Sequence, residues 1–525
     1  MKRAALAAAA LVLLAPGAAR SSASGDVVLI GRGLDRAVAN GSLTTDEAAE
    51  YRVDLRSAYA TVRNLGGGRE RNLRAVLHDV ALQWKGYTSP RAYALFSMLQ
   101  TNASWFGNHA VPAAKTDISD ADGVVYRFFP GQGFQLHPLA NAGALNAKVA
   151  AGDIDGAEQL ALALAARGVP GSGALRFEYY FPFGGGRPPW TSGMAQAVMA
   201  QAFARASTLT GDTMLENDAV AIFHAVQLGL VRQLAQGPWI RLYSFDPGVV
   251  LNAQLQAILS LEDYAAETAD PSASTLAASM LASAARLLPR FDTGYWSLYS
   301  LAGAESPLEY HTYDIQLLSK LAVRHPEGPW ADVAERFTEY RTQPPSFRVG
   351  PAPGTVYPRP ADGYKDAAPI RFWLSKRSRV TVSAEGRATT AWLSHGSHTL
   401  AWSTGSLRPG PYEPTLSAVD LAGNKTSLPL PPITVAWDTT APDLTASAAG
   451  RRLTWRATDP GTPWLDLRVL LARSGRHATL WLGRRGLAGS RTLRLPPGRW
   501  SAALVAANSA GKRTRVPLGV LHGAG

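Results

Sequence analysis

Two short segments combine tyrosines with a histidine beside an apolar helical pattern. Tyr299 ends the sequence Phe-Asp-Thr-Gly-Tyr-Trp-Ser-Leu-Tyr, and Tyr310 opens the sequence Tyr-His-Thr-Tyr-Asp, which contains His311. A phenol can accept or return a proton when neighbouring cations lower its pKa, which is about 10 in water. His311 could polarise a sugar hydroxyl group or lower the pKa of a tyrosine, but it could equally be a structural residue at a helix N-terminus. The two segments indicate the rim of an active site.

Two further motifs precede these segments and complete an ordered set of four. One is Trp190-x-Ser-x-Met-x-Gln196, and in the other Tyr243 lies upstream of a Val-Leu-Asn run that ends at Asn252. Together the four motifs resemble the C-terminal catalytic domain of the D-glucuronyl C5-epimerases, which invert the acid-bearing carbon of uronates inside polysaccharides. The resemblance covers roughly residues 126–342.

The resemblance implies that Tyr243, Tyr299 and Tyr310 transfer protons without a cofactor. Epimerisation removes the proton beside the carboxylate and returns one to the opposite face, so two proton-transfer groups must flank the sugar ring. The enolate-like dianion that forms needs positive charge or hydrogen-bond donors at the sugar carboxylate. The resemblance also implies that Trp190 and Gln196 lie near the cleft, where a helix begins.

The sequence departs from the family pattern at three positions. Leu242 replaces an acidic residue, Ala302 replaces a basic residue, and Asp314 replaces a histidine. The group that would bind the substrate carboxylate is therefore unassigned. Three arginines could take its place: Arg176, Arg187 and Arg241.

Two more side chains are candidates for substrate binding, in addition to Arg241, Asn252, Trp190, Gln196 and His311. Glu178 lies in the aromatic sequence Arg-Phe-Glu-Tyr-Tyr-Phe-Pro-Phe, which could stack on sugar faces or form a hairpin that packs its rings inward. His137 ends a loop with several glycines, which could face the cleft or simply form a tight turn.

The pattern of apolar residues predicts a multidomain chain: a mainly α, (α/α) toroid-type domain followed by two all-β immunoglobulin-like sandwiches. Long alanine-rich helices are expected up to about residue 342, for example over 141–167 and 213–236. Beyond 343 the pattern changes to alternating strands, and an internal repeat with an offset of 88 residues indicates two similar modules. The predicted divisions are a signal peptide (1–23), helical hairpins (26–115), the toroid (116–345) and the sandwiches (350–438 and 439–525).

Composition indicates where the protein works and what it meets. Lys2 and Arg3, followed by a short apolar run, predict a secretory signal peptide, and no later segment is long enough to span a membrane. The chain has no cysteine, so a lipid-modified cysteine is excluded and the protein is expected to be secreted or at the cell surface. The net charge of +12 favours an anionic, uronate-containing polysaccharide or cell-envelope glycans as partners, rather than nucleic acid.

Two other functions remain open on this sequence. A polysaccharide lyase would begin with the same proton abstraction and then expel the glycosidic oxygen. A surface protein could instead bind glycans without turnover, with the sandwiches as spacers or adhesion modules, and the unassigned carboxylate-binding group favours this alternative. No phosphate-binding loop, zinc motif or serine nucleophile motif occurs. The scattered histidines argue against a metal site, although Asp292 and Asp314 could bind calcium structurally. Asp292 is favoured instead as the residue that shapes the turn before Tyr299.

Overall fold

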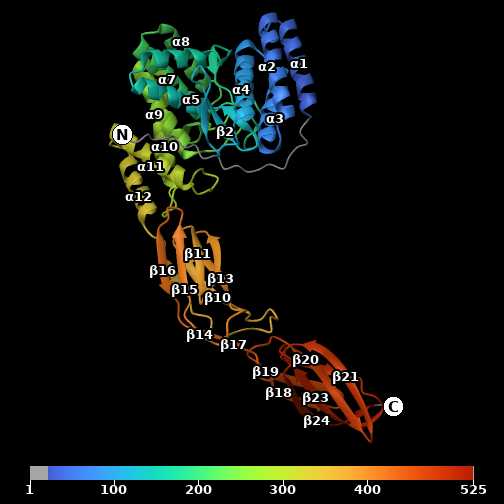
Figure 1. The fold of residues 1–525 in the computed structure, drawn as a ribbon. Coiled ribbons are helices and arrows are strands. Elements are labelled where there is room, and N and C mark those ends of the chain that lie inside the picture. The colour runs from blue at the N-terminus through green and yellow to red at the C-terminus, as the bar shows by residue number, and fades with distance from the viewer. Residues whose placement is uncertain (1–21, 524–525) are drawn as a thin grey trace. The chain divides into compact units, whose positions relative to one another are not determined.

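The structure, a computed structural model, describes residues 22–523 and divides into two compact units at Arg341 and Thr342. The first unit is helical and the second is rich in β-strands, so the predicted change of composition after residue 342 is confirmed at this level (Figure 1). Residues 1–21 of the predicted signal peptide lie outside the described residues. Between residues 22 and 523, no helix is long and apolar enough to cross a lipid bilayer.

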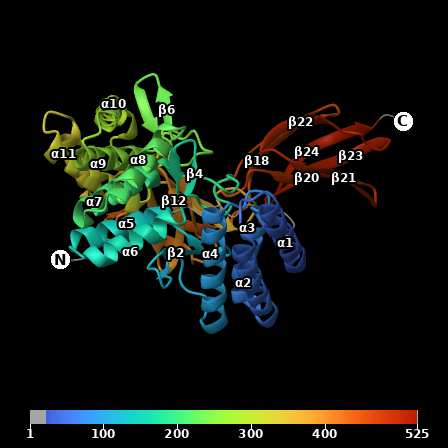
Figure 2. The ribbon, with the colours of Figure 1, turned by 90° about the horizontal axis from the view of Figure 1, so that it is seen from above.

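Four helices open the first unit and lie side by side (Figure 2). Their bounds are α1 (Ala23–Ala39), α2 (Thr45–Asn64), α3 (Gly67–Leu82) and α4 (Ser89–Asn108). The start of α2 is fixed by a reciprocal pair of hydrogen bonds, in which Thr44 accepts from the backbone of Glu47 and Glu47 accepts from the backbone of Thr44.

Eight helices and several short strands make up the rest of the first unit. The helices are α5 (Pro138–Ala150), α6 (Ile154–Ala165), α7 (Gly193–Thr210), α8 (Thr213–Gln227), α9 (Leu251–Thr268), α10 (Pro271–Leu287), α11 (Leu308–Arg324) and α12 (Trp330–Thr342), with a 3-10 turn at Leu288–Phe291. The strands are β1 (Asp117–Ser119), β2 (Val125–Phe129), β3 (Gly133–Leu136), β4 (Val169–Gly171), β5 (Ala174–Arg176), β6 (Val231–Leu234) and β7 (Gly237–Ile240). Helices α5, α7, α9 and α11 contact one another in that order, and α6, α8 and α10 pack against them.

Helix α7 lies at the centre of this arrangement and is buried on nearly every side. Its sequence is rich in alanine and has no charged residue before Arg205, as expected for a helix enclosed by other helices. It begins where the Ser192 hydroxyl accepts a hydrogen bond from the Ala195 amide (3.2 Å) and ends at Gly211, whose φ of 74° favours glycine.

One apolar core includes buried side chains from Ile30 to Phe337. These side chains lie on both sides of the predicted domain boundary at 115/116. The boundary itself stays a prediction.

The second unit contains two separate apolar cores, each enclosed by sheets. The first set of strands is β8 (Phe347–Val349), β9 (Val356–Arg359), β10 (Ala367–Leu374), β11 (Ser378–Ala384), β12 (Arg387–Leu393), β13 (Gly396–Ser403), β14 (Gly410–Tyr412), β15 (Thr415–Asp420), β16 (Lys425–Pro429) and β17 (Ile433–Trp437). The second set is β18 (Asp443–Ala449), β19 (Arg452–Thr458), β20 (Leu465–Arg473), β21 (Arg476–Arg485), β22 (Ala488–Thr492), β23 (Gly498–Ala507) and β24 (Arg513–Gly523). Each set includes one four-stranded antiparallel sheet, β12-β11-β15-β16 in the first and β21-β20-β23-β24 in the second.

Charge is distributed very unevenly between the two units. Residues 342–525 contain 24 of the 52 lysines and arginines but only 9 of the 40 aspartates and glutamates, which gives this part a formal net charge of +15. The remaining 28 basic and 31 acidic residues give residues 1–341 a net charge of −3. The positive charge that favoured an anionic partner therefore belongs to the β-rich unit rather than to the helical one.

Candidate active site

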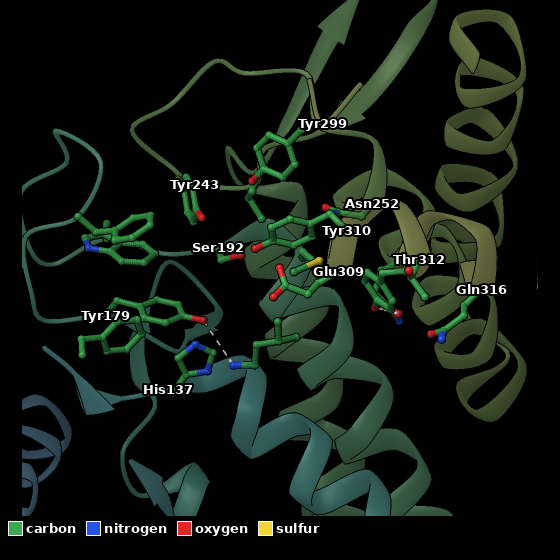
Figure 3. A pocket seen from close by; sticks show the side chains of 18 of the residues that line it. His137, Tyr179, Ser192, Tyr243, Asn252, Tyr299, Glu309, Tyr310, Thr312 and Gln316 are labelled. Atoms are coloured by element: carbon green, nitrogen blue, oxygen red, sulfur yellow. Dashed lines mark hydrogen bonds between the residues drawn. The ribbon is translucent and has the colours of Figure 1, made fainter. Parts of the chain in front are cut away.

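A cavity of about 470 Å³ in the helical unit contains the three predicted proton-transfer tyrosines. Figure 3 shows the hydroxyl groups of Tyr243, Tyr299 and Tyr310 directed toward one another. The rings of Tyr299 and Tyr310 have centroids 5.1 Å apart. The fold thus brings together residues that are separated by up to 67 positions in the chain.

Each tyrosine is positioned by a different element. Tyr243 lies in the loop between β7 and α9, where its ring stacks against that of Phe245 at a centroid distance of 5.5 Å. Tyr299 lies between the 3-10 turn and α11, and its backbone carbonyl accepts from the amide of Leu251 at the start of α9 (3.3 Å). Tyr310 occupies the first turn of α11.

Burial raises the pKa of all three tyrosines. The pKa of Tyr299 is raised to about 12, whereas those of Tyr243 and Tyr310 are raised further. The neighbouring Tyr299 hydroxyl adds to the rise in the pKa of Tyr243, and the Tyr243 hydroxyl partly offsets the rise for Tyr299. The expectation that nearby cations lower these pKa values is wrong, because burial is the largest cause for each. Tyr299 is the tyrosine of the three that ionises most readily.

One side of the cavity is a wall of aromatic rings. Trp190 is at its centre: its indole stacks on Tyr179 at a centroid distance of 4.1 Å, and its Nε1 donates to the Phe181 carbonyl (2.8 Å). Phe183 and Phe129 extend the wall on either side. Flat apolar rings of this kind can stack on the faces of sugar rings, so the wall suits a carbohydrate ligand.

The opposite side is one face of helix α11. Residues spaced three or four positions apart share a helix face, and five of them line the cavity: Glu309, Thr312, Tyr313, Gln316 and Lys320. The 11 positions from Glu309 to Lys320 correspond to about 16 Å along the helix. Sequence reasoning missed this face, because a polar helix face is most often solvated; its periodic spacing was the available signal.

Charge in the cavity is sparse. Among the described residues that line it, Lys320 is the one cation and Glu309 the one acidic side chain, and neither is buried. The three arginines considered for the substrate carboxylate are absent from the lining, so the expectation of an arginine-containing cleft is wrong. Lys320 is ten residues after Tyr310, about 15 Å along the helix. A group that contacts Lys320 is therefore well separated from one that contacts Tyr310.

Two other predicted residues, His137 and Asn252, also line the cavity. His137 begins helix α5, where its Nδ1 accepts a hydrogen bond from the Ala140 amide (3.0 Å). Burial lowers the pKa of His137 to about 3, so its imidazole is neutral at physiological pH. Asn252 lies in the first turn of α9 and is nearly fully buried.

Comparison with protein families bears directly on this part of the chain. Residues 172–339 match the D-glucuronyl C5-epimerase C-terminus family. The resemblance deduced from the four motifs is thereby confirmed, and the match includes all three tyrosines, Trp190 and α11. No curated protein sequence matches the chain.

Solved structures show only distant similarity. The endo-beta-1,4-glucanase CMCax from Acetobacter xylinum is 15% identical, over 39% of this chain and 72% of that one, with a TM-score of 0.30. The family 8 glycosyl hydrolase Cel10 from Klebsiella pneumoniae is 14% identical, over 41% and 73%, with a TM-score of 0.31. The CbhA fibronectin(III)-like modules from Clostridium thermocellum are 12% identical, over 34% and 94%, with a TM-score of 0.17. Similarity at these levels does not establish a shared fold.

Four predicted substrate-binding residues in the family-matched segment do not line the cavity. Gln196 is fully buried and bonds the backbone of Phe177 and Leu175, which fixes the chain after β5 to helix α7. Glu178 forms two 2.8 Å hydrogen bonds with Arg91 of α4. The Arg241 guanidinium contacts the Ser244 carbonyl of its own loop (3.5 Å).

The fourth, His311, belongs to a buried polar cluster beneath Tyr310. Its Nε2 donates to the Phe337 carbonyl of α12 (2.8 Å), and its Nδ1 lies 2.7 Å from the Ser297 hydroxyl. That hydroxyl also lies 3.3 Å from Asp314, whose pKa is raised well above its usual range by burial. The cluster connects the tyrosine-bearing loop, α11 and α12, so the structural interpretation of His311 holds rather than the substrate-binding one.

Replacing Asp314 by asparagine tests the protonation of this cluster. A carboxyl group with a raised pKa stabilises the fold below its unfolded pKa of about 4, and this contribution is lost as the pH rises toward the folded value. The free energy of unfolding of the unchanged protein should therefore fall relative to that of Asp314→Asn as the pH is raised from 4 to 8. Urea denaturation at several pH values measures the difference, and a difference that stays constant with pH would show that burial does not raise the pKa of Asp314.

Residues 22–523 contain no group of three or more histidines, aspartates or glutamates that could hold a metal ion. Asp292, which the sequence offered as a structural calcium ligand as well as a turn residue, accepts hydrogen bonds from the Gly294 amide and from Tyr340. It shapes the turn that precedes Tyr299.

Proposed function

We propose that the helical unit is an epimerase that inverts C5 of uronate residues, of the glucuronate type, within a polysaccharide. The match over residues 172–339 supports a carbohydrate isomerase. The observation that carries the finer assignment is the convergence of three tyrosine hydroxyl groups in one cavity opposite a wall of aromatic rings. A sugar stacked on that wall would present its ring edge to the tyrosines.

The pKa values and contacts assign different roles to the three tyrosines. Tyr299 is the proposed base, because its pKa is raised least of the three. The Tyr243 and Tyr299 hydroxyl groups shift each other's pKa, so they are proposed to lie on the same face of the sugar ring. Tyr310 is the proposed acid that returns a proton to the other face.

The proposal includes the architecture and location expected from the sequence. The successive contacts of α5, α7, α9 and α11, with α6, α8 and α10 packed against them, support an (α/α) toroid. The two β-rich cores support tandem immunoglobulin-like sandwiches. The protein is proposed to be secreted or held at the cell surface and to act without a cofactor.

Hydrogen exchange at the reacting carbon tests the function directly. The purified protein is incubated in heavy water with polysaccharides that contain glucuronate, and NMR measures deuterium at the ring carbon that bears the carboxylate. Incorporation without chain cleavage is the expected result. An unsaturated product that absorbs ultraviolet light would instead identify a lyase, and absence of exchange across the panel would exclude both reactions.

A second candidate function is glycan binding without turnover. It is favoured by the raised pKa of every tyrosine in the cavity and by the absence of arginine from the described lining. Binding of a glucuronate polymer that persists after Tyr299→Phe and Tyr310→Phe, with no exchange by the unchanged protein, would establish this function in place of the epimerase.

A further inference from the structure

The two four-stranded sheets of the β-rich unit carry the same row of residues across their strands. In each row a tryptophan pairs with an arginine, the arginine with a valine, and the valine with a basic residue, on four successive strands. Row 1 consists of Trp392, Arg379, Val419 and Lys425, on β12, β11, β15 and β16. Row 2 consists of Trp481, Arg468, Val505 and Arg515, on β21, β20, β23 and β24.

Both rows lie on the outward faces of their sheets. Successive side chains of a strand point to opposite faces, and the residues after each arginine, Val380 and Val469, are fully buried in the two cores. The tryptophans are exposed, Trp392 by 54% and Trp481 by 72%. Exposed tryptophan contributes little to folding, so packing does not account for either ring.

The rows belong to a hairpin that occurs twice with an offset of 89 residues. Both copies turn at a glycine with positive φ, 71° at Gly386 and 69° at Gly475. Besides these glycines, the residues shared by the two hairpins at this offset are Arg379 and Arg468, Val380 and Val469, Arg387 and Arg476, Thr390 and Thr479, Trp392 and Trp481, and Leu393 and Leu482. Among the outward positions next to the rows, Thr381 corresponds to Leu470, whereas Thr390 and Thr479 are the same. The tryptophan and arginine of each row therefore recur on a face that differs in part between the copies.

The chemistry of a row fits a sugar polymer with negative groups. In row 2 the Arg468 guanidinium lies 5.4 Å from the centroid of the Trp481 ring. A tryptophan face can stack on a sugar ring, and a guanidinium beside it can pair with a carboxylate or sulfate through two parallel hydrogen bonds. The arginine and the last basic residue of a row are two strands apart, about 10 Å. A chain of sugars that crosses the strands can contact both.

We propose that rows 1 and 2 are two copies of a binding site for an anionic polysaccharide. The formal charge of +15 on residues 342–525 supplies the complementary potential, and the charge of −3 on the helical unit does not. Each row offers a single exposed ring on a flat sheet, whereas single-stranded nucleic acid is held by successive stacked bases in a basic groove. This proposal does not rest on the function proposed for the cavity.

Removal of the row arginines tests the sites. Titration calorimetry with the full chain measures binding of dextran sulfate, a polysaccharide whose negative groups are sulfates. Dextran, which has the same backbone without charge, is the uncharged comparison. The double variant Arg379→Gln and Arg468→Gln should bind dextran sulfate about tenfold more weakly or worse. Its matched control is Arg371→Gln with Arg456→Gln, which removes the same charge from exposed positions of the other sheets, on β10 and β19. Equal losses in the two variants would overturn the proposal in favour of unspecific attraction.

The tryptophans provide a second, independent measurement. The double variant Trp392→Ala and Trp481→Ala should bind dextran sulfate more weakly and lose the change in tryptophan fluorescence that accompanies binding. Its control is Trp437→Ala, which removes another exposed ring beside an arginine and should preserve both the affinity and the fluorescence change. Circular dichroism confirms that the variants are folded. Unchanged affinity after loss of both row tryptophans would contradict the proposal, as would tighter binding of double-stranded DNA than of dextran sulfate.

Discussion

The variant Tyr299→Phe is expected to lower the rate of uronate turnover by about 10²- to 10⁴-fold, the contribution typical of a general base. The change removes one hydroxyl group and leaves a ring of the same shape. Deuterium incorporation measured by NMR gives the rate of proton abstraction, and polymer affinity should change little, because stacking on the aromatic wall does not require this hydroxyl.

The pH dependence of turnover provides a signature of the same residue. With a pKa of about 12, the phenolate fraction of Tyr299 rises tenfold with each pH unit, so kcat/KM should increase from pH 6 to 9. Tyr299→Phe should remove this dependence from whatever rate remains.

Tyr340→Phe is the matched control for the loss of a tyrosine hydroxyl group. Tyr340 lies on α12 outside the cavity lining, and its hydroxyl donates to Asp292 (3.0 Å). This variant should retain the turnover of the unchanged protein. Full activity of Tyr299→Phe would refute the assignment of Tyr299 as the base. Tyr310 would then be the candidate base.

Removal of Glu178 is expected to destabilise the helical unit by about 3–5 kcal/mol, because it leaves a buried cation without its counter-ion. The side chains of Arg91 and Glu178 are only 17% and 8% exposed, and two hydrogen bonds of 2.8 Å join them. The pair connects α4 to the segment after β5. Urea denaturation of Glu178→Ala measures the loss.

A double variant separates the ion pair from its individual charges. Replacement of both partners, Arg91→Met with Glu178→Leu, should recover most of the stability lost in Glu178→Ala, since no unpaired charge remains in the interior. At temperatures where Glu178→Ala is folded, its affinity for glucuronate polymers should equal that of the unchanged protein. A selective loss of affinity with normal stability would restore Glu178 as a substrate-binding residue.

The long helices of the fold could be predicted from the sequence, and their interruptions were the harder part. The apolar periodicity predicts helices over 192–210, 250–268 and 310–324, and α7, α9 and α11 begin within two residues of these starts. The expected helix over 141–167 is instead two helices, because Gly152 adopts a φ of 68° and Asp153 begins a new helix by accepting from the Gly156 amide. The helix expected over 213–236 ends at Gln227, and the hairpin β6-β7 follows after Gly229, whose φ is 99°. In both places one glycine changed the path of the chain.

The candidate site was predicted in part, and the errors have one physical cause. Motif order identified Tyr243, Tyr299 and Tyr310, because residue type and sequence context suffice for that step. Sequence does not reveal which face of an element meets the cavity and which meets the core. Gln196 and His311 have the polar chemistry of ligand-binding residues, yet they satisfy buried backbone groups instead. The polar face of α11 shows the converse, since it resembled a solvated surface and lines the cavity.

The accessible side of α11 determines how a long molecule could meet the tyrosines. Glu309, Gln316 and Lys320 are exposed to solvent along the helix, whereas the opposite wall around Trp190 is buried. A polymer can therefore settle sideways against the tyrosines at an internal unit, and no free chain end has to be threaded in. Early in a reaction, converted units would then be scattered along each molecule, with no gradient from either terminus.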